Sequence, residues 1–300
     1  MLRLGIVDLD SSHSVEFSRR FNHAGVDREQ WVEGAQVVAA WSGGSVMAPE
    51  RISGFQAELE SIGVGIVDRH EQLLDQIDGV LILSLCGDCH LERARLFLEA
   101  RIPTFVDKPF ACSVSDAREI VELAHQHQTT LLNSSALRFS REVKDSVLQN
   151  QQLGPINGAI TYGPAKRATG NPGLFHYGIH SVELLFELLG PGCEKVSTVW
   201  SADAEVVTGV WADGRIGTIR GNRTGVTSYG FVAYCEGGVV PEIVSTRFAY
   251  RNLCREIVRS FESGQPSVSH KSNLDVVRFV QASLQSEQSG GQPVLLRDVC

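Results

Sequence analysis

The sequence predicts an α/β protein of two domains, the first built on a parallel sheet and the second on a mostly antiparallel sheet. In the first half, short continuous apolar runs alternate with helical patterns from residue 2 onward, which is typical of parallel strands covered on both faces. In the second half the short runs follow one another directly, and Asp213-Gly214 between two of them is a strong hairpin signal. We therefore predict domains at residues 1–137 and 138–300.

The first domain is expected to open with a strand, a turn and a helix, which is the order of a doubly wound, Rossmann-type nucleotide-binding domain. Its predicted strands occupy residues 2–7, 36–41, 65–67, 79–85, 105–106 and 129–132. Its predicted helices occupy residues 14–23, 51–62, 71–77, 91–100 and 115–126.

The second domain is expected to be α+β. Its predicted strands occupy residues 156–162, 197–202, 206–211, 216–220 and 230–236. Its predicted helices occupy residues 141–149, 177–189, 253–263 and 273–286.

Composition argues against a nucleic-acid-binding, membrane or secreted protein. The formal net charge is -8, from 27 basic and 35 acidic residues, which disfavours binding to nucleic acid or to a membrane surface. No stretch approaches the roughly 20 apolar residues of a membrane span, and residues 1–7 lack the features of a signal peptide. Seven scattered cysteines suit a reducing compartment. We expect a cytoplasmic protein.

Residues 104–110 (TFVDKPF) place an acid, a lysine and a proline directly after a predicted buried strand. The proline fixes the direction of the chain, and the residue before it is biased toward extended geometry. Lys108 should therefore project from a strand end, where open α/β sheets bind their ligands. The alternative is an ordinary loop lysine.

The turn after the first strand departs from the Gly-x-Gly-x-x-Gly pattern that lets a pyrophosphate approach the backbone. Its residues are Asp8, Leu9, Asp10, Ser11, Ser12 and His13. A carboxylate about 4 Å from a phosphate would cost roughly 4 kcal/mol at an effective dielectric constant near 20. We expect Asp10 to cap the following helix, and His13, if protonated, to offset part of the negative charge.

Residues 86–90 (CGDCH) match three motifs. Haem attachment does not suit the expected compartment. A dithiol pair at a helix N-terminus would have a lowered thiol pKa. A zinc site would lack an obvious fourth ligand. We favour none of these three interpretations of the segment.

The order of these segments resembles the Gfo/Idh/MocA oxidoreductase family over nearly the whole chain. Residues 80–86, then His90, then residues 106–109 are similar to that family's strand, following helix and Glu-Lys-Pro motif, with Asp107 in place of the glutamate. Residues 175–183 (FHYGIHSVE) resemble its Asp-x-Gly-x-His-x-x-Asp helix. The C-terminal residues 261–266 and the helix after them are also similar to the family's ending.

The resemblance implies an NAD- or NADP-dependent dehydrogenase that acts on a sugar, cyclitol or related hydroxy compound. It places Lys108 and His180 beside the substrate carbon, and chemistry supports both roles: histidine can exchange the hydroxyl proton near neutral pH, and lysine can polarise the carbonyl oxygen. The cofactor-binding set that we predict is Asp8, Asp10, Ser11, Ser12, His13, Ser42, Cys86, His90 and Lys108.

Ser42 enters this set because the second strand lacks its usual ribose-binding acid. Residues 41–45 (WSGGS) offer hydroxyls and backbone donors instead, which could suit a 2′-phosphate. The family usually associates through the sheet of its second domain, so we also expect a homo-oligomer, either a dimer or a tetramer.

His176 and His180 are spaced four residues apart, so on a helix they would share a face. His176 stands where the family commonly has an acid, and we include it with Lys108 and His180 as a catalytic candidate. The same histidines with Glu183 suggest a rival, metal-assisted enzyme. Candidate substrate contacts are Arg138, Arg167, Asn171 and Tyr177.

Arg138 could bind an anionic or polyol substrate or form an interdomain salt bridge. A further alternative for the whole chain is a non-catalytic ligand-binding or regulatory protein that kept the fold and lost the cofactor. The replaced glycines at Asp8, Asp10 and His13 favour that alternative.

Overall fold

The computed structural model describes residues 1–145, 151–225 and 227–300, and its chain forms two compact units. Unit 1 comprises Met1–Ala111, Asp116–Ser134 and Tyr250–Ser269. Unit 2 comprises Cys112–Ser115, Ser135–Ala249 and His270–Cys300.

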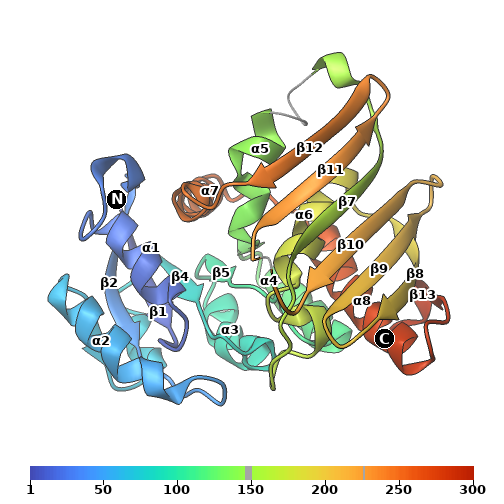
Figure 1. Cartoon of the computed structure of the whole chain (residues 1–300). Coiled ribbons are helices and arrows are strands. Elements are labelled where there is room, and N and C mark those ends of the chain that lie inside the picture. The colour runs from blue at the N-terminus through green and yellow to red at the C-terminus, as the bar shows by residue number, and fades with distance from the viewer. Residues whose placement is uncertain (146–150, 226) are drawn as a thin grey trace. The chain divides into compact units, whose positions relative to one another are not determined.

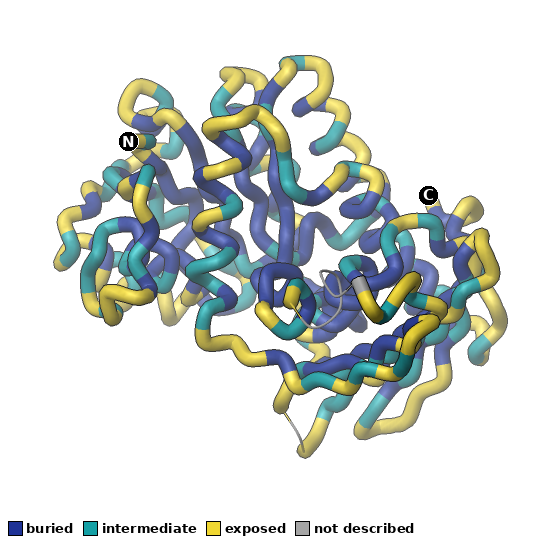
Figure 2. Tube along the Cα trace, turned by 90° about the horizontal axis from the view of Figure 1, so that it is seen from above, coloured by how far each residue is buried: buried dark blue, intermediate teal, exposed yellow. Residues whose placement is uncertain are grey.

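Unit 1 contains a six-stranded sheet in the order β3-β2-β1-β4-β5-β6, with every neighbouring pair parallel (Figure 1). Its strands are β1 (Leu2–Val7), β2 (Ala35–Trp41), β3 (Gly65–Val67), β4 (Gly79–Ile82), β5 (Thr104–Val106) and β6 (Leu131–Asn133). Strands β4, β5 and β6 are buried along their whole length, as the dark blue of Figure 2 shows for the core. This is the predicted Rossmann-type sheet, and the fold-class prediction is confirmed.

The strand order reverses between β1 and β4, because β2 and β3 continue from one edge of β1 and β4 to β6 from the other. Right-handed crossovers then place helices on opposite faces of the sheet on either side of this switch point. The helices are α1 (His13–Phe21), α2 (Ile52–Ser61), α3 (His90–Glu99) and α4 (Val114–Gln126). Ligands of such sheets bind at the carboxyl ends of the strands that flank the reversal, here β1 and β4.

One predicted helix of unit 1 is wrong. Residues 71–77 were expected to be helical, but the structure has a single 3-10 turn, η3 (His70–Leu73). The turn begins where the Arg69 N–H donates to the Gln72 side chain at 2.9 Å, and the next residues continue with i→i+3 bonds.

Almost all of helix α7 (Ala249–Ser263) belongs to unit 1, although residues 138–300 were predicted to form the second domain. Tyr250 contacts the rings of His13 and Phe17 at 4.9 and 5.7 Å between centroids. Phe261 lies against the start of β4, where a Cβ on Gly79 would come within 2.6 Å of its ring. A helix was predicted at residues 253–263, but its packing partner was not.

Unit 2 is built on a seven-stranded sheet in the order β12-β11-β7-β10-β9-β8-β13. All pairs are antiparallel except β7 with β10, so the predicted α+β domain is confirmed. Its strands are β7 (Ile156–Pro164), β8 (Cys193–Trp200), β9 (Ala204–Trp211), β10 (Ile216–Asn222), β11 (Tyr229–Cys235), β12 (Gly238–Val244) and β13 (Val294–Leu295). Gly214, at φ 86°, forms the predicted turn between β9 and β10.

Strands β12 and β13 were not predicted. Strand β12 alternates exposed and half-buried residues at the edge of the sheet, and β13 has only two residues, so neither makes a strong apolar run. Helices α6 (Ile179–Leu189) and α8 (His270–Gln288) pack on the sheet. Helix α5 (Arg141–Val143) covers the start of the helix predicted at 141–149, and residues 146–150 lie outside the described part of the chain.

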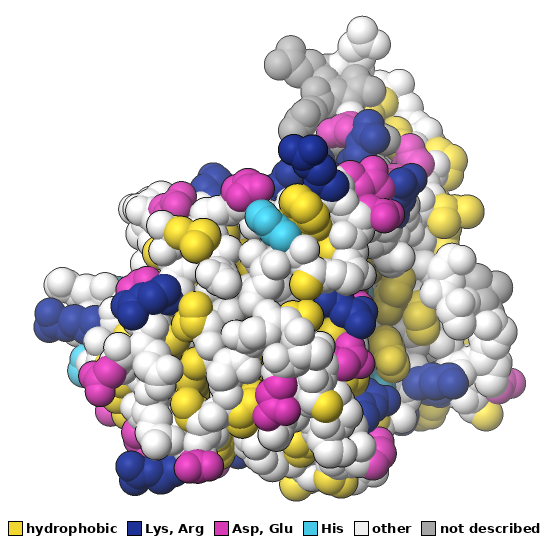
Figure 3. All heavy atoms as spheres, turned by 90° about the vertical axis from the view of Figure 1, so that its left-hand side faces the viewer, with side chains coloured by type: hydrophobic (Ala, Val, Ile, Leu, Met, Phe, Trp, Pro, Cys, Tyr) yellow, Lys and Arg dark blue, Asp and Glu magenta, His cyan; other side chains and the backbone are white. Residues whose placement is uncertain are grey.

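Within the described residues, no helix has the length and apolar character needed to span a bilayer. Figure 3 shows one face of the molecule, on which basic and acidic side chains are interspersed. That face therefore presents no large field of a single sign.

The packing of α7 on unit 1 can be tested with a pair of glycine substitutions. We expect Gly79→Ala to lower the free energy of unfolding by about 1–3 kcal/mol, because its Cβ would push into the Phe261 ring. In the control, Gly54→Ala, no atom of the described residues lies within 4 Å of the new Cβ inside α2. That change should stabilise the protein by about 0.5–1 kcal/mol. Denaturant unfolding measures both, and equal effects would contradict the packing.

Candidate functional site

Asp8 stands directly after β1, at the place of the first glycine in the usual dinucleotide turn. Its φ is 68°, so it adopts the left-handed conformation that glycine normally supplies. The turn therefore keeps its sharp geometry without glycine. The side chain is only 1% exposed, and Gly43 lies so close that a Cβ there would collide with the carboxylate.

The Asp8 carboxylate is held by donors from the segments that follow β4. The Ser84 hydroxyl donates to Oδ2, and Arg93 Nε on α3 donates to the same oxygen at 3.1 Å. Arg93 also lies over the Trp41 ring at 4.9 Å. Burial raises the pKa of Asp8 despite the opposing effects of Ser84 and Arg93. The ion pair with Arg93 reduces the negative charge that a phosphate would meet.

Asp10 does not cap α1, contrary to our expectation. Its Oδ2 accepts a hydrogen bond from Ser45 Oγ at 2.6 Å, and its Oδ1 accepts one from the Leu85 N–H at 2.9 Å. The N-cap of α1 is Ser12, which makes no side-chain cap bond. Asp10 instead joins the loop after β2 to the loop after β4, because both offer donors at the carboxyl end of the sheet.

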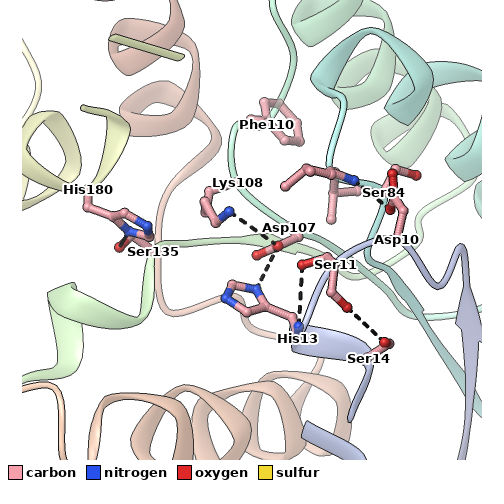
Figure 4. Close-up of polar contacts among 12 residues, drawn as sticks. Asp10, Ser11, His13, Ser14, Ser84, Asp107, Lys108, Phe110, Ser135 and His180 are labelled. Carbon is pink, nitrogen blue, oxygen red and sulfur yellow. Dashed lines mark hydrogen bonds and ion pairs between the residues drawn. The ribbon is translucent and has the colours of Figure 1, made fainter. Parts of the chain in front are cut away.

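His13 pairs with the acid of the TFVDKPF segment and not with Asp8 or Asp10. Its Nδ1 lies 2.7 Å from Asp107 Oδ2, and Lys108 Nζ lies 3.9 Å from the same oxygen (Figure 4). The imidazole stacks on Phe17 at 4.9 Å. Lys108 follows β5, as predicted, and its peptide bond to Pro109 is cis.

Asp107 is 1% exposed and remains ionised. Burial acts to raise the pKa of its carboxyl, but the charges of His13 and Lys108 outweigh burial and hold that pKa at about 2. His13 and Lys108 therefore share one buried carboxylate at the end of β5. Lys108 keeps 12% of its side chain exposed at this position.

The turn retains the donors that a pyrophosphate requires. Among the described residues, the backbone N–H groups of Asp10, Ser11 and Ser12 donate no hydrogen bond, and they lie just before α1. Ser11 Oγ accepts from the His13 N–H at 3.3 Å. Because successive N–H groups at a helix N-terminus bind anions, and both carboxylates are held by other donors, these residues fit the pyrophosphate of a dinucleotide.

Three other predicted cofactor-binding residues, Ser42, His90 and Cys86, lie in loops that follow β2 and β4 or at the start of α3. The Ser42 carbonyl accepts the Leu9 N–H at 3.2 Å. His90 is fully buried, and its ring nitrogens lie 3.2 Å from the Phe110 carbonyl oxygen and 2.9 Å from the Ser84 carbonyl oxygen. His90 thus ties the loops after β4 and β5 together. Cys86 is 4% exposed and begins the turn before α3.

In unit 2, His180 lies in the first turn of α6 and is oriented by Ser135. The Ser135 Oγ lies 2.7 Å from His180 Nδ1 (Figure 4). The His180 ring meets the Tyr229 ring edge-on, with 5.4 Å between the centroids. The Ser135 N–H donates to Glu183 Oε2 at 2.6 Å, one turn further along α6. Ser135 therefore fixes both the helix and the imidazole.

His176 does not share a helix face with His180, contrary to our expectation. Helix α6 begins at Ile179, and its first backbone hydrogen bonds go to the carbonyls of Tyr177 and Gly178. His176 ends the preceding 3-10 turn, η8 (Gly173–Phe175), with ψ -109°, outside helical geometry. It contacts the Tyr177 ring, which is 47% exposed.

Arg138 is 2% exposed, and its guanidinium contacts side chains of unit 2. Its Nε donates to Glu183 at 2.8 Å and its Nη1 to Glu187 at 3.0 Å, while Nη2 lies 3.4 Å from Ser272 Oγ. The guanidinium therefore anchors α6 and α8 through partners of unit 2. Its role as a substrate contact stays a prediction. Burial acts to raise the pKa of Glu187, but the charges of Arg138 and Lys144 hold that pKa below its ordinary value.

The metal alternative gains no support. The Glu183 carboxylate accepts hydrogen bonds from Arg138 and the Ser135 N–H. No group of three or more His, Cys, Asp or Glu residues in the described chain could hold a metal ion.

Two further substrate candidates lie on the loop before η8. Asn171 is 1% exposed and accepts a hydrogen bond from Cys112 Sγ at 3.3 Å. Arg167 is 39% exposed and pairs with Glu287 at 2.5 Å and with Glu205 at 3.6 Å.

Comparison with known proteins finds a family whose sequence model matches most of the parallel-sheet part of the chain. Residues 17–134 match the sequence model of the GFO_IDH_MocA family, described as "Oxidoreductase family, NAD-binding Rossmann fold". The predicted resemblance to the Gfo/Idh/MocA family is confirmed. The predicted oxidoreductase class and nicotinamide cofactor are confirmed at the level of this Gfo/Idh/MocA family description. No curated protein sequence matches the chain.

Solved structures share the fold over nearly the whole chain. A probable dehydrogenase from Thermotoga maritima is 18% identical, with a TM-score of 0.77 and 100% of each chain covered. A putative myo-inositol dehydrogenase from Sinorhizobium meliloti is 14% identical, with a TM-score of 0.81, covering 99% of this chain and 100% of that one.

A scyllo-inositol dehydrogenase from Lactobacillus casei, solved with NAD(H) and scyllo-inositol, is also 14% identical, with a TM-score of 0.81 and coverage of 99% and 100%. At these identities the likeness shows the fold alone.

Three residues of these sites were not predicted: Ser84, Arg93 and Ser135. The position of Ser84 and Ser135 shortly after strands β4 and β6 was a signal that could have drawn attention to them. Arg93 gave no such signal, because a helical arginine looks like any surface cation until its partner is known.

The buried position of Asp107 predicts a pH-dependent contribution to stability. Its folded-state pKa, about 2, lies below the ordinary 3.8, so the contribution is present above about pH 4 and is lost as the pH falls toward 2. We expect Asp107→Asn to lower the free energy of unfolding by about 2 kcal/mol at pH 7, and the gap from the unsubstituted protein to close below pH 4.

The matched control is Asp78→Asn. Hydrogen bonds from Arg3 lower the pKa of Asp78 to about 2 as well, but its side chain is 38% exposed. Solvent screening should keep that effect below about 1 kcal/mol. Equal effects of the two variants across the pH range would contradict the buried pairing.

Proposed function

We propose that the protein is a nicotinamide-dinucleotide-dependent oxidoreductase acting on a sugar, cyclitol or related polyol. The observation that carries this proposal is the turn before α1, where successive backbone N–H groups remain available and both carboxylates are held by other donors. The inositol dehydrogenases among the similar structures make inositol isomers the first substrates to assay. A dinucleotide, when bound, would supply or accept the hydride.

The residues of the chain would manage the accompanying proton and charge. Oxidation of a secondary alcohol releases the hydroxyl proton, and histidine can accept it near neutral pH. We assign this proton to His180 Nε2, because Ser135 fixes the ring through Nδ1. Lys108 would stabilise the partial negative charge on the substrate oxygen. The Asp107 carboxylate, shared with His13, orients the lysine.

Cofactor binding is tested by titrating NAD, NADH, NADP and NADPH against the purified protein. We expect at least one to bind, and we expect Arg93→Gln to raise its Kd about tenfold or more, because the Asp8 charge near the phosphates would lose its counter-charge. Arg95→Gln is the control, since Arg95 lies on the same helix but pairs with Glu99 and Glu119 at the surface.

The titration also separates the enzyme from a silent binding protein of the same fold. If none of the four dinucleotides binds at millimolar concentration, the dehydrogenase proposal is refuted. Unchanged affinity in Arg93→Gln, with binding intact, would refute only the role given to Arg93.

Turnover tests the catalytic assignments residue by residue. We expect Lys108→Ala and His180→Ala each to lower kcat by about a hundredfold or more without unfolding the protein. Ser135→Ala should lower kcat by about tenfold, with KM unchanged, because the imidazole loses its hydrogen bond. Activity that survives both the Lys108 and the His180 substitutions would refute the assignment.

Ser140→Ala is the matched control for Ser135→Ala. Ser140 directly follows the same 3-10 segment, η5 (Ala136–Phe139), and is 2% exposed. Among the described residues, its Oγ has no hydrogen-bond partner. Its removal should leave kcat unchanged, and Ser135→Thr should retain most of the activity. If Ser140→Ala were as damaging as Ser135→Ala, the effect would be one of packing.

We further propose that the chain associates with copies of itself through the outer face of the unit 2 sheet. Large apolar side chains are exposed on this face, among them Ile216, Val239 and Ile243 at 53%, 60% and 68%. A hollow of about 390 Å³ lies on the same sheet, lined in part by Ile216 and Tyr234. Contiguous exposed apolar surface of this kind marks association sites.

Sedimentation velocity tests the proposed association. We expect a dimer or larger species, and Ile243→Glu should shift it toward monomer because a charge would be buried at the interface. Val46→Glu, at an 80% exposed position in unit 1, is the control. A wild-type protein that is monomeric at every concentration would contradict the proposal.

A further inference from the structure

Cys86 and Cys89 enclose one turn at the start of a helix. Cys86 is the N-cap of η4 (Gly87–Cys89), with extended φ and ψ of -87° and 118°, and η4 runs directly into α3. The Cys89 N–H donates to the Cys86 carbonyl at 3.2 Å, which closes the turn. Both cysteines are free thiols, three residues apart on this closed turn. The pair is therefore already brought together in the folded chain.

The two thiols differ in their ease of ionisation. The hydrogen bond from Cys89, helped by the backbone N–H groups of Asp88 and Cys89, lowers the pKa of Cys86 to about 7, although burial opposes this. The same hydrogen bond and burial raise the pKa of Cys89. A helix N-terminus also favours a thiolate. At neutral pH Cys86 is thus the nucleophile and Cys89 holds the proton.

Access limits what can react with this pair. Cys86 is only 4% exposed, while Cys89 is half-buried. A protein disulfide is too large to reach a sulfur with so little exposure, but a hydroperoxide is small enough. Burial raises the pKa of two other buried cysteines, Cys193 to about 12 and Cys254 further still, so both are poor nucleophiles.

We propose that Cys86 and Cys89 form a peroxide-reactive dithiol that closes to a reversible disulfide. The Cys86 thiolate attacks the O–O bond of the peroxide, forming a sulfenic acid and releasing an alcohol or water. The Cys89 sulfur then attacks the Cys86 sulfur, so that an S–S bond forms, the S–O bond breaks, and water leaves with the Cys89 proton. The two cysteines lose two electrons in total, and the peroxide gains them. A dithiol reductant restores both thiols.

The test is peptide mapping of the full-length protein after exposure to hydrogen peroxide at pH 7.5. We expect a Cys86–Cys89 disulfide to form at least about tenfold faster than any modification of Cys193, because reactivity follows thiolate content. Dithiothreitol should reverse it. The rate should rise with pH and level off above about pH 7, following the pKa of Cys86.

Single substitutions separate the two roles. Cys89→Ser should stop at a sulfenic acid on Cys86, which dimedone captures, whereas Cys86→Ser should leave Cys89 unreacted. Cys193→Ser is the control and should behave as the unsubstituted protein. Oxidation of Cys86 no faster than that of Cys193, or a disulfide joining Cys89 to a different cysteine, would overturn the proposal.

Discussion

Charge compensation at the carboxyl ends of β1, β4 and β5 is the constraint on which unit 1 depends. Three buried carboxylates, on Asp8, Asp10 and Asp107, follow β1 or β5 within a few residues. Each has a partner in a segment distant in sequence: Asp8 pairs with Arg93, Asp10 accepts from Ser45 and Leu85, and Asp107 pairs with His13. A glycine turn needs no such partners. Here polar contacts hold the loops that a glycine-rich turn would leave independent.

Unit 2 also joins its elements through a buried, paired charge, but here the central residue is a cation and its partners are acids and a hydroxyl. The buried cation Arg138 joins α6 to α8 through Glu183, Glu187 and Ser272. Removal of one partner of such a pair leaves a buried charge, which costs more than the pair contributes. Glu183 also accepts the Ser135 N–H, so the salt bridge that stabilises α6 helps to place the hydroxyl that orients His180.

The sequence predicted the sheets better than the site. Strands such as β1 and β3 were located to the residue, because continuous apolar runs and turn signals are local. The 3-10 turn η3 and the start of α6 were misjudged, because both depend on local hydrogen bonds that periodicity does not report. Asp8, His13 and Lys108 could be named as candidates, but their partners could not. Arg93 is 85 residues from Asp8, and Asp107 is 94 from His13.

The close approach of Gly43 to Asp8 restricts the order in which these two positions can change during evolution. Its φ is 62°, and a side chain there would occupy the position of the Asp8 carboxylate. The two positions therefore form an epistatic pair: aspartate at 8 is tolerated only with glycine at 43, and a larger residue at 43 requires that Asp8 be lost first. A lineage that returned to a glycine-rich turn would have to change position 8 before position 43 became free to vary.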